Sequence, residues 1–359
     1  MGKALHKPYT RYTPPLTVTE SDYVFAASEM RGRLSRDGKP WTVRTIFLYN
    51  VERVLYKHNG RHAKREKPVS EKTKANRFNE IRSMANTLHN LGYRITLPTQ
   101  IRQKHVKALT HFWESRKDLM PASVVQKVSI LRTFLGWMGK EGVMEFMTVE
   151  DMFANPEAMK REYVAKVDKS WDDKFDIDAL IAKVMDDCKY TGRQLKLSHL
   201  FGLRAKESML FRPQLDYDQK VGFIHVRRGT KGGRPRTVPV ETSEQRQYLE
   251  ELQGYCYDVN ESMIPRRSDQ KSWIKHYYRV TKRNGISKET GITPHGLRHG
   301  YAQRLYERTT GHPAAVKDVT QISRDIDMIE ERIARLMVSE NLGHSRESIT
   351  SAYIGSHHE

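Results

Sequence analysis

The segment PHGLRHGYA at residues 294–302 is the most informative stretch of the sequence, and the C-terminal half can be interpreted outward from it. His295 and Arg298 are three residues apart, so on a helix their side chains project from one face. An imidazole beside a guanidinium combines a group that transfers protons with one that binds phosphate oxygens. A lone histidine is more often a satisfied core residue, so the interpretation needs support from elsewhere in the chain.

Four other segments of the C-terminal half carry similar chemistry. Taken singly, each has an ordinary explanation: a surface ion pair, a solvated basic turn, a core histidine or a packed tyrosine. They are LRAKE at 203–207 with Arg204 and Glu207, GTKGGR at 229–234 with Lys231, NLGH at 341–344 with His344, and Tyr353.

Together the five segments supply two guanidinium groups, several proton donors or acceptors, and a phenol. Cleavage of a DNA phosphodiester without a metal needs these groups: cations for the non-bridging oxygens, a proton donor for the leaving oxygen, and a side-chain oxygen that attacks. The sequence has no clustered Asp/Glu set typical of a two-metal nuclease and no glycine-rich phosphate loop.

The periodicity of apolar residues predicts a mainly helical chain. Helices are expected at 41–58, 70–91, 99–119, 122–139, 178–189 and 194–211, and a further amphipathic helix at 318–338, with Ile329, Ile333 and Leu336 in its apolar stripe. Two short β-branched segments, 221–226 and 236–240, flank the glycine-rich turn 229–233 and predict a β-hairpin.

The charge is concentrated in one part of the chain. The formal net charge is +19, and residues 1–140 hold 27 Lys+Arg against 10 Asp+Glu, while the remaining residues hold 35 against 33. This asymmetry predicts a module that binds a polyanion. No apolar run is long enough to span a membrane, and two cysteines fit a reducing cytosol, so we expect a cytoplasmic protein.

Along the chain the five segments follow one another as LRAKE, GTKGGR, PHGLRHGYA, NLGH and Tyr353, and the predicted hairpin lies between the first and the third. This arrangement resembles the signature of the tyrosine recombinase (phage-type integrase) family. The resemblance extends over about residues 172–353, and the helical segment 70–142 is similar to the family's core-binding domain. It implies a mainly α fold with a small β-sheet or hairpin: a helical core-binding domain and a mixed α+β catalytic domain. We therefore expect an extension or accessory DNA-binding arm at 1–67, the core-binding domain at 68–148, a linker at 149–171 and the catalytic domain at 172–359.

The resemblance also implies a role for each site residue. Tyr353 would be the nucleophile that forms a 3′-phosphotyrosyl bond, Arg204 and Arg298 would bind the scissile phosphate, and Lys231 would protonate the 5′ oxygen. His295 would be the general acid/base for the tyrosine, His344 would hydrogen-bond the phosphate, and Glu207 would orient the cluster without reacting. Neither a metal nor another cofactor is implied.

The expected function is that of a site-specific DNA recombinase or integrase of a mobile element, associated with double-stranded DNA. The resemblance implies a homotetramer on paired DNA sites, possible accessory DNA-bending proteins, and no membrane partner. Two alternatives stay open, a DNA-relaxing enzyme similar to type IB topoisomerases and a catalytically silent DNA-binding regulator. The residues predicted to contact DNA phosphates are the basic ones of segment 57–74: Lys57, Arg61, Lys64, Arg65, Lys67, Lys72 and Lys74.

Overall fold

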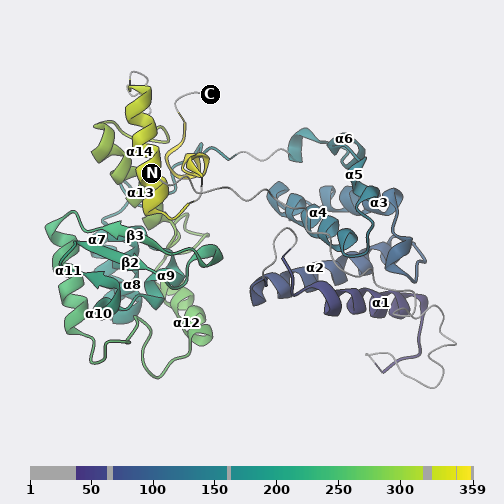
Figure 1. Ribbon diagram of the computed structural model, residues 1–359, viewed down its shortest axis with the longest axis horizontal. Helices are drawn as coiled ribbons and strands as arrows, with labels where there is room; N and C mark the ends of the chain where they lie inside the picture. The colour runs from purple at the N-terminus through teal and green to yellow at the C-terminus, as the bar shows by residue number, and fades with distance from the viewer. Residues whose placement is uncertain (1–37, 63–67, 160–162, 318–325, 345, 357–359) are drawn as a thin grey trace, which may run out of the picture. The chain divides into compact units, whose positions relative to one another are not determined.

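The computed structural model describes residues 38–62, 68–159, 163–317, 326–344 and 346–356. The chain divides into two compact units between residues 161 and 162, and each unit has its own hydrophobic core. Figure 1 shows the helices of the first unit in purple and blue and those of the second in green and yellow. No helix among the described residues is long and apolar enough to cross a membrane.

Among its described residues, the regular elements of the first unit are all helical, apart from one isolated β-bridge. Its helices begin where the sequence supplies capping groups: the Thr42 and Ser70 hydroxyls accept hydrogen bonds from backbone N–H groups of the first turns of α1 and α2, and Pro121 is the first residue of α4. The helices are α1 (Val43–His58), α2 (Glu71–Asn90), α3 (Gln103–Glu114), α4 (Pro121–Gly136), α5 (Gly142–Glu145) and α6 (Val149–Met152).

The helical unit begins earlier than the predicted boundary at residue 68. Helix α1 packs against α2, and its residues Phe47, Val51 and Val54 are at most 1% exposed in the same core as Leu88 of α2. The apolar face of α1 can be buried only by this packing, so residues 43–58 belong to the unit and not to a separate arm. What remains of the predicted arm, residues 1–37, lies outside the described residues.

The predicted basic linker is largely the junction of two helices. Lys57 lies in the last turn of α1, Lys72 and Lys74 lie in the first turn of α2, and Arg61 forms an isolated β-bridge with Pro68. Lys64, Arg65 and Lys67 lie outside the described residues.

The second unit combines helices with one small sheet, which confirms the predicted fold class. The sheet has the order β1-β2-β3 and is antiparallel throughout, and the predicted hairpin is β2–β3, with Ile224 paired to Val238 in the core. The two-residue strand β1 was not predicted. The elements are α7 (Ile177–Asp187), α8 (Lys189–Phe201), α9 (Ala205–Leu210), α10 (Pro213–Asp216), β1 (Tyr217–Asp218), β2 (Phe223–Val226), β3 (Arg236–Pro239), α11 (Ser243–Gly254), α12 (Gln270–Arg283), α13 (Gly296–Thr310), α14 (Met328–Asn341) and α15 (Ser351–Ile354).

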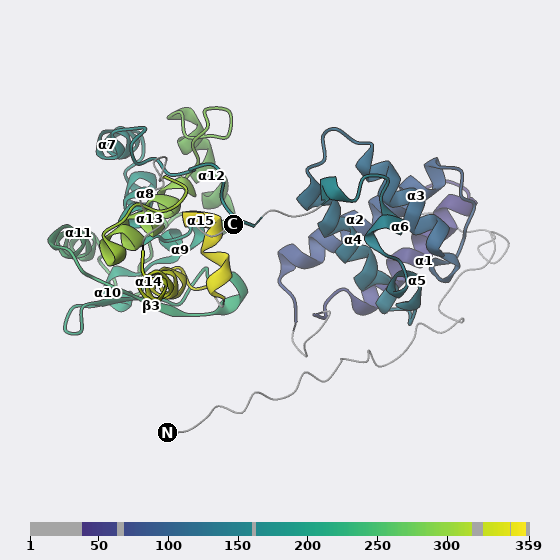
Figure 2. The same ribbon diagram turned by 90° about the horizontal axis from the view of Figure 1, so that it is seen from above.

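Helix α13 is the central helix of this unit. It contacts α8, α14 and the short α15, which gather around it in Figure 2. The PHGLRHGYA segment forms its N-terminal half, and residues 296–303 are all buried. The helix therefore carries Arg298 into the interior of the unit, next to the C-terminal helix that contains Tyr353, whereas His295, the residue before the helix, is exposed.

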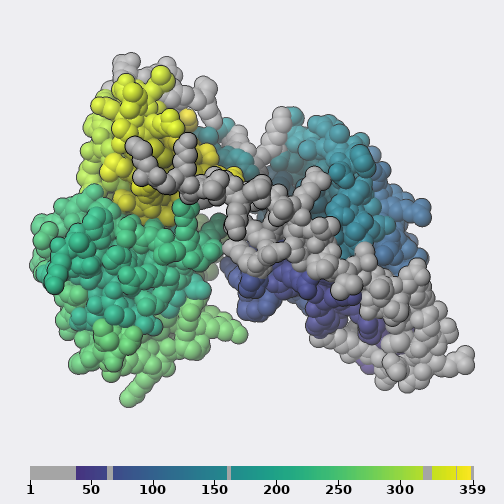
Figure 3. All heavy atoms as spheres, in the orientation of Figure 1, coloured from purple at the N-terminus to yellow at the C-terminus, as the bar shows by residue number. Residues whose placement is uncertain are grey.

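Helix α14 departs from the predicted apolar stripe. The predicted positions Ile329, Ile333 and Leu336 are exposed by 69%, 49% and 42%, whereas Ala334 and Val338 are buried against the core. The helix lies at the surface of the unit (yellow in Figure 3). Its C-terminal end is held at the core, because Leu342 directly after α14 is buried and its carbonyl accepts a hydrogen bond from Arg298. Residues 318–325 of the predicted helix lie outside the described part of the chain.

Candidate active site

The carboxylate of Glu207 is the centre of a buried ionic cluster. It accepts a hydrogen bond from Arg204 Nη1 at 2.7 Å and two from Arg236, at 2.9 and 2.8 Å, and Arg298 Nη1 lies 3.8 Å away. The side chain of Glu207 is fully buried. Burial alone would raise its pKa, but the hydrogen bonds and charges of the three arginines lower the pKa of Glu207 to about 2. One carboxylate thus fixes the positions of three guanidinium groups.

Arg298 is fully buried and is held mainly by backbone carbonyl groups. It donates hydrogen bonds to the carbonyls of Gly202 and Leu342, and its Nη2 lies 3.4 Å from His344 Nε2. Burial lowers the pKa of Arg298 to about 10, so it stays charged at neutral pH. Gly202 has a φ of +62°, and a Cβ there would lie 2.5 Å from the Tyr301 ring, so only glycine allows this approach.

Three histidines surround the ring of Tyr353. Its centroid lies 4.6 Å from that of His299, 5.3 Å from His344 and 5.9 Å from His295. The Arg298 guanidinium carbon lies 5.8 Å from the same centroid. The proposed nucleophile, the proton-transfer groups and one phosphate-binding arginine are therefore neighbours.

The three imidazoles are neutral at pH 7. Burial, followed by the charges of Arg298 and Arg204, lowers the pKa of His344 to about 3, and burial with the neighbouring His295 lowers that of His299 to about 3. His295 is exposed to solvent, yet desolvation by the surrounding protein, followed by the Arg298 charge, lowers its pKa to about 4. A neutral imidazole has a free lone pair, so each ring can accept a proton.

Lys231 makes no hydrogen bond or ion pair with this cluster, but its charge is among those that lower the pKa of His344. Lys231 is exposed in the turn between β2 and β3, and no hydrogen bond or ion pair joins it to any residue that the structure describes. The next two residues, Gly232 and Gly233, have φ values of +76° and +72°, which favour glycine. The turn therefore carries a free ammonium group on a glycine-rich backbone. No group of His, Cys, Asp or Glu in the described ranges could hold a metal ion.

Comparison with known proteins agrees with this geometry. Residues 161–304 match the integrase family model. The tyrosine recombinase XerA of Pyrococcus furiosus is 30% identical over 160 residues, 39% of this chain and 52% of that protein. The tyrosine recombinase XerD of Oceanobacillus iheyensis is 26% identical over 249 residues, 62% of this chain and 79% of that protein.

These matches show that the chain is similar to tyrosine recombinases and integrases. Its match spans about half the length of the archaeal XerA proteins. Among solved structures of similar fold is a lambda integrase dimer bound to a COC' core site, with a TM-score of 0.51, 19% identity, and coverage of 84% of this chain and 75% of that one. Another is the Tn1549 transposon integrase in complex with circular intermediate DNA, with a TM-score of 0.53, 14% identity, and coverage of 88% and 95%.

Sequence reasoning missed two residues of this candidate site. Arg236 was assigned only to a strand, although its guanidinium binds both oxygens of Glu207 and the carbonyl of Asn341. A basic residue at the start of a strand gives no signal of such a role. His299 lies in the quoted segment but was assigned no role. Its spacing of four residues from His295, which places both side chains on one face of a helix, was the available signal.

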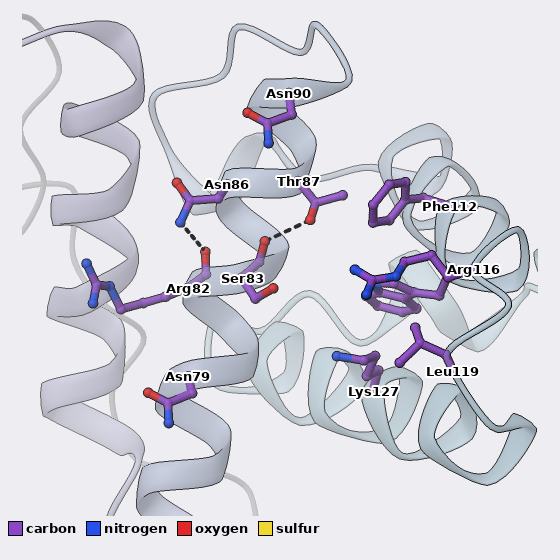
Figure 4. Close-up of a pocket in the computed structure, with 11 residues that line it drawn as sticks. Asn79, Arg82, Ser83, Asn86, Thr87, Asn90, Phe112, Arg116, Leu119 and Lys127 are labelled. Atoms are coloured by element: carbon purple, nitrogen blue, oxygen red, sulfur yellow. Dashed lines mark hydrogen bonds between the residues drawn. The ribbon is translucent and has the colours of Figure 1, made fainter.

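A second candidate surface lies in the helical unit. A polar groove of about 600 Å³ runs along α2, where the side chains of Asn79, Ser83, Asn86 and Asn90 follow one another on one face (Figure 4). Amides and hydroxyls are the groups that read base edges in DNA, and cations bind its phosphates. The remaining lining residues, which include three cations, are Arg82, Thr87, Phe112, Trp113, Arg116, Leu119 and Lys127.

The depressed pKa of Glu207 makes a prediction about stability. In the unfolded chain a glutamate titrates near 4.5, so the stabilisation is complete above that pH and is lost as the pH falls towards the folded value of about 2. We expect wild type to lose roughly 3 kcal/mol of unfolding free energy between pH 5 and 2 that Glu207→Gln does not lose. Urea unfolding of both proteins at several pH values measures the difference, and parallel pH profiles would contradict it.

Proposed function

We propose that this chain is a site-specific DNA recombinase that cleaves and rejoins double-stranded DNA through a 3′-phosphotyrosyl intermediate. The observation that carries the proposal is the position of Tyr353 beside Arg298 and among three neutral histidines. A binding module has no need of a tyrosine surrounded by proton acceptors and arginines.

The cleavage step uses groups of this chain alone. The Tyr353 oxygen attacks the scissile phosphorus, and its proton passes to His295, whose pKa of about 4 leaves it free to accept one. The bond to the 5′ oxygen breaks, and that oxygen takes a proton from Lys231. Religation is the reverse: a 5′ hydroxyl attacks the phosphotyrosyl bond and the tyrosine regains its proton. Because the linkage conserves the phosphoester bond, no nucleotide hydrolysis is required.

Arg204 and Arg298 would neutralise the non-bridging oxygens of the transition state, and His344 would donate a hydrogen bond to one of them. Arg204 is poised for this role, because its side chain is 21% exposed although Glu207 holds it. Arg298 is fully buried, and the Tyr353 ring lies near it. A phosphate can therefore reach Arg298 only when the side chains above it move.

The basic charge that would bind DNA belongs mainly to the helical unit. Residues 1–37 hold only six Lys+Arg against four Asp+Glu, so most of the excess in the first 140 residues lies from α1 onward. The proposed DNA contacts are the groove along α2 and the basic residues of segment 57–74. Removing residues 1–67 would also delete α1 from the core, so it is not a clean test of an N-terminal arm.

Recombination rather than relaxation is favoured by the family matches, which are to recombinases and integrases. A solved lambda integrase tetramer bound to a Holliday junction has the same fold, with a TM-score of 0.50, 16% identity, and coverage of 86% of this chain and 77% of that one. We therefore include a homotetramer on paired sites, action on a mobile element and accessory DNA-bending proteins in the proposal, with the DNA in the cytoplasm as its place of action. A topoisomerase would relax supercoiled DNA without exchanging strands between sites, and a silent regulator would form no covalent adduct.

The first test concerns the nucleophile. Wild type incubated with a nicked suicide substrate in the presence of a chelator should become covalently attached to a 3′ end, whereas Tyr353→Phe should bind the same DNA and form no adduct. Denaturing gel electrophoresis with strand-specific labels identifies the attached end. Tyr301→Phe is the matched control, because it removes another buried phenol that lies in the same core. Attachment to a 5′ end, or an absolute need for a divalent metal, would exclude the proposed mechanism.

The second test separates proton donation from phosphate binding. Lys231→Ala should cleave slowly when the leaving group is a 5′ oxygen, and a bridging 5′ sulfur should restore cleavage, because a thiolate leaves without a proton. Arg298→Ala should lose on the order of a hundredfold or more with both substrates, because it removes a charge from the transition state. Single-turnover cleavage rates measure both effects. Equal rescue of the two variants would contradict the assignment of their roles.

The third test concerns the groove along α2. Asn79→Ala and Asn90→Ala should reduce discrimination between the correct and a mismatched site by about 1–3 kcal/mol each, because each removes an amide that can pair with a base edge. Arg116→Met should weaken binding to all sequences and flatten the slope of log K against log salt by about 0.9. Fluorescence anisotropy at several salt concentrations measures both. If the asparagine variants change only the salt slope, the groove does not read bases.

A further inference from the structure

The main chain of Tyr353 is linked by hydrogen bonds to the segment at the start of the second unit. Gln303 of α13 is 1% exposed, and its side-chain nitrogen donates to the carboxylate of Asp168 at 2.8 Å and to the Tyr353 carbonyl at 3.1 Å. Asp168 lies near the start of the second unit, within the predicted linker 149–171. One amide group thus connects the linker segment to the proposed nucleophile.

Asp168 is itself firmly held. Its carboxylate accepts hydrogen bonds from the backbone N–H and the hydroxyl of Ser170 at 2.8 and 2.7 Å, and Lys174 lies 3.4 Å away. Burial would raise its pKa, but the hydrogen bonds from Gln303 and Ser170 lower the pKa of Asp168 to about 2. The carboxylate therefore remains a charged acceptor at every pH at which the protein would be assayed.

Helix α15 cannot set the position of Tyr353 alone. It has four residues, so it forms a single turn, and isolated turns are unstable. A second contact from the linker supports it, because the backbone N–H of Ala165 donates to the carbonyl of Ser351 at 2.8 Å. On the other side, Arg335 of α14 donates to the carbonyl of Gly355 at 3.1 Å.

We propose that Asp168 and Gln303 are positioning residues, which hold the main chain of Tyr353 while its side chain moves to the phosphate. This inference rests on the proposed function. Arg298 becomes accessible only when the side chains above it move. If the main chain of Tyr353 is fixed, the tyrosine can move only by rotation of its side chain. A misplacement of about 1 Å can reduce the rate of attack a hundredfold.

The test compares variants of the full-length chain. Gln303→Met keeps the length of the side chain without a donor, and Asp168→Ala removes the acceptor, so both should cleave at least tenfold more slowly than wild type with unchanged DNA affinity. Asp168→Asn retains an oxygen that can accept from Gln303 and should stay within about threefold of wild type. Single-turnover adduct formation, DNA affinity and Tm are measured for each.

Gln245→Met is the matched control. Gln245 of α11 is also a buried glutamine, 3% exposed, and it donates to the Leu200 carbonyl at 2.7 Å. This variant should lower Tm without slowing adduct formation more than about twofold. A positioning defect should also persist with the 5′-sulfur substrate, because attack and not departure of the leaving group is impaired.

The outcomes separate this inference from the proposed function. If wild type forms no 3′ adduct, the proposed function fails. If wild type forms it and Gln303→Met and Asp168→Ala react equally fast or faster, the positioning role is wrong. It is also wrong if Asp168→Asn is as slow as Asp168→Ala, or if the slow variants lose rate only in proportion to a loss of Tm that Gln245→Met reproduces. Should Gln303→Met fail to fold, the comparison of the two Asp168 variants decides the question.

Discussion

The ionic cluster around Glu207 is the constraint on which the site depends. Arginine side chains have several rotatable bonds and repel one another, so three of them gather in a buried space only around an anion. The Glu207 carboxylate supplies that anion and contacts Arg204, Arg236 and Arg298. Arg204 directly precedes α9, Arg236 begins β3 and Arg298 lies in α13, so the cluster also fixes these three elements relative to one another. The Glu207 carboxylate therefore both holds these elements together and positions the arginines of the candidate site.

The distribution of protons follows from the same cluster. Burial is the main cause that lowers the pKa values of the histidines, and the positive charges of Arg298 and Arg204 add to this effect. The resting site therefore has cationic arginines and neutral imidazoles, which is the protonation state that nucleophilic attack by a phenol requires. A phosphate would add negative charge and raise the pKa values of the histidines, so its arrival would favour the proton transfer that follows.

The structure brings several of the predicted site residues together, whereas it moves the predicted start of the helical unit. The candidate segments were recognised from their reactive residue types and their order along the chain, and the hairpin because a glycine-rich turn separates two β-branched runs. Arg236 could not be found, since its role arises from a contact with Glu207, 29 residues earlier in the chain. The assignment of α1 failed for a similar reason: a basic, proline-containing segment after it was interpreted as a linker, although the apolar face of α1 is buried by α2. The stripe on α14 failed because periodicity shows that a helix is amphipathic but does not show which neighbour decides its rotation.

Under the proposed function, the burial of Arg298 beside the tyrosine ring would affect which phosphates the protein can attack. A free nucleotide or an inorganic phosphate offers only a few contacts, too little binding energy to displace buried side chains. A long duplex contacts many basic residues at once and can supply that energy at a distance from the reacting atom. The cell contains small phosphate esters in far greater number than any one DNA site, and a centre that opened only for a polymer would stay inert toward them.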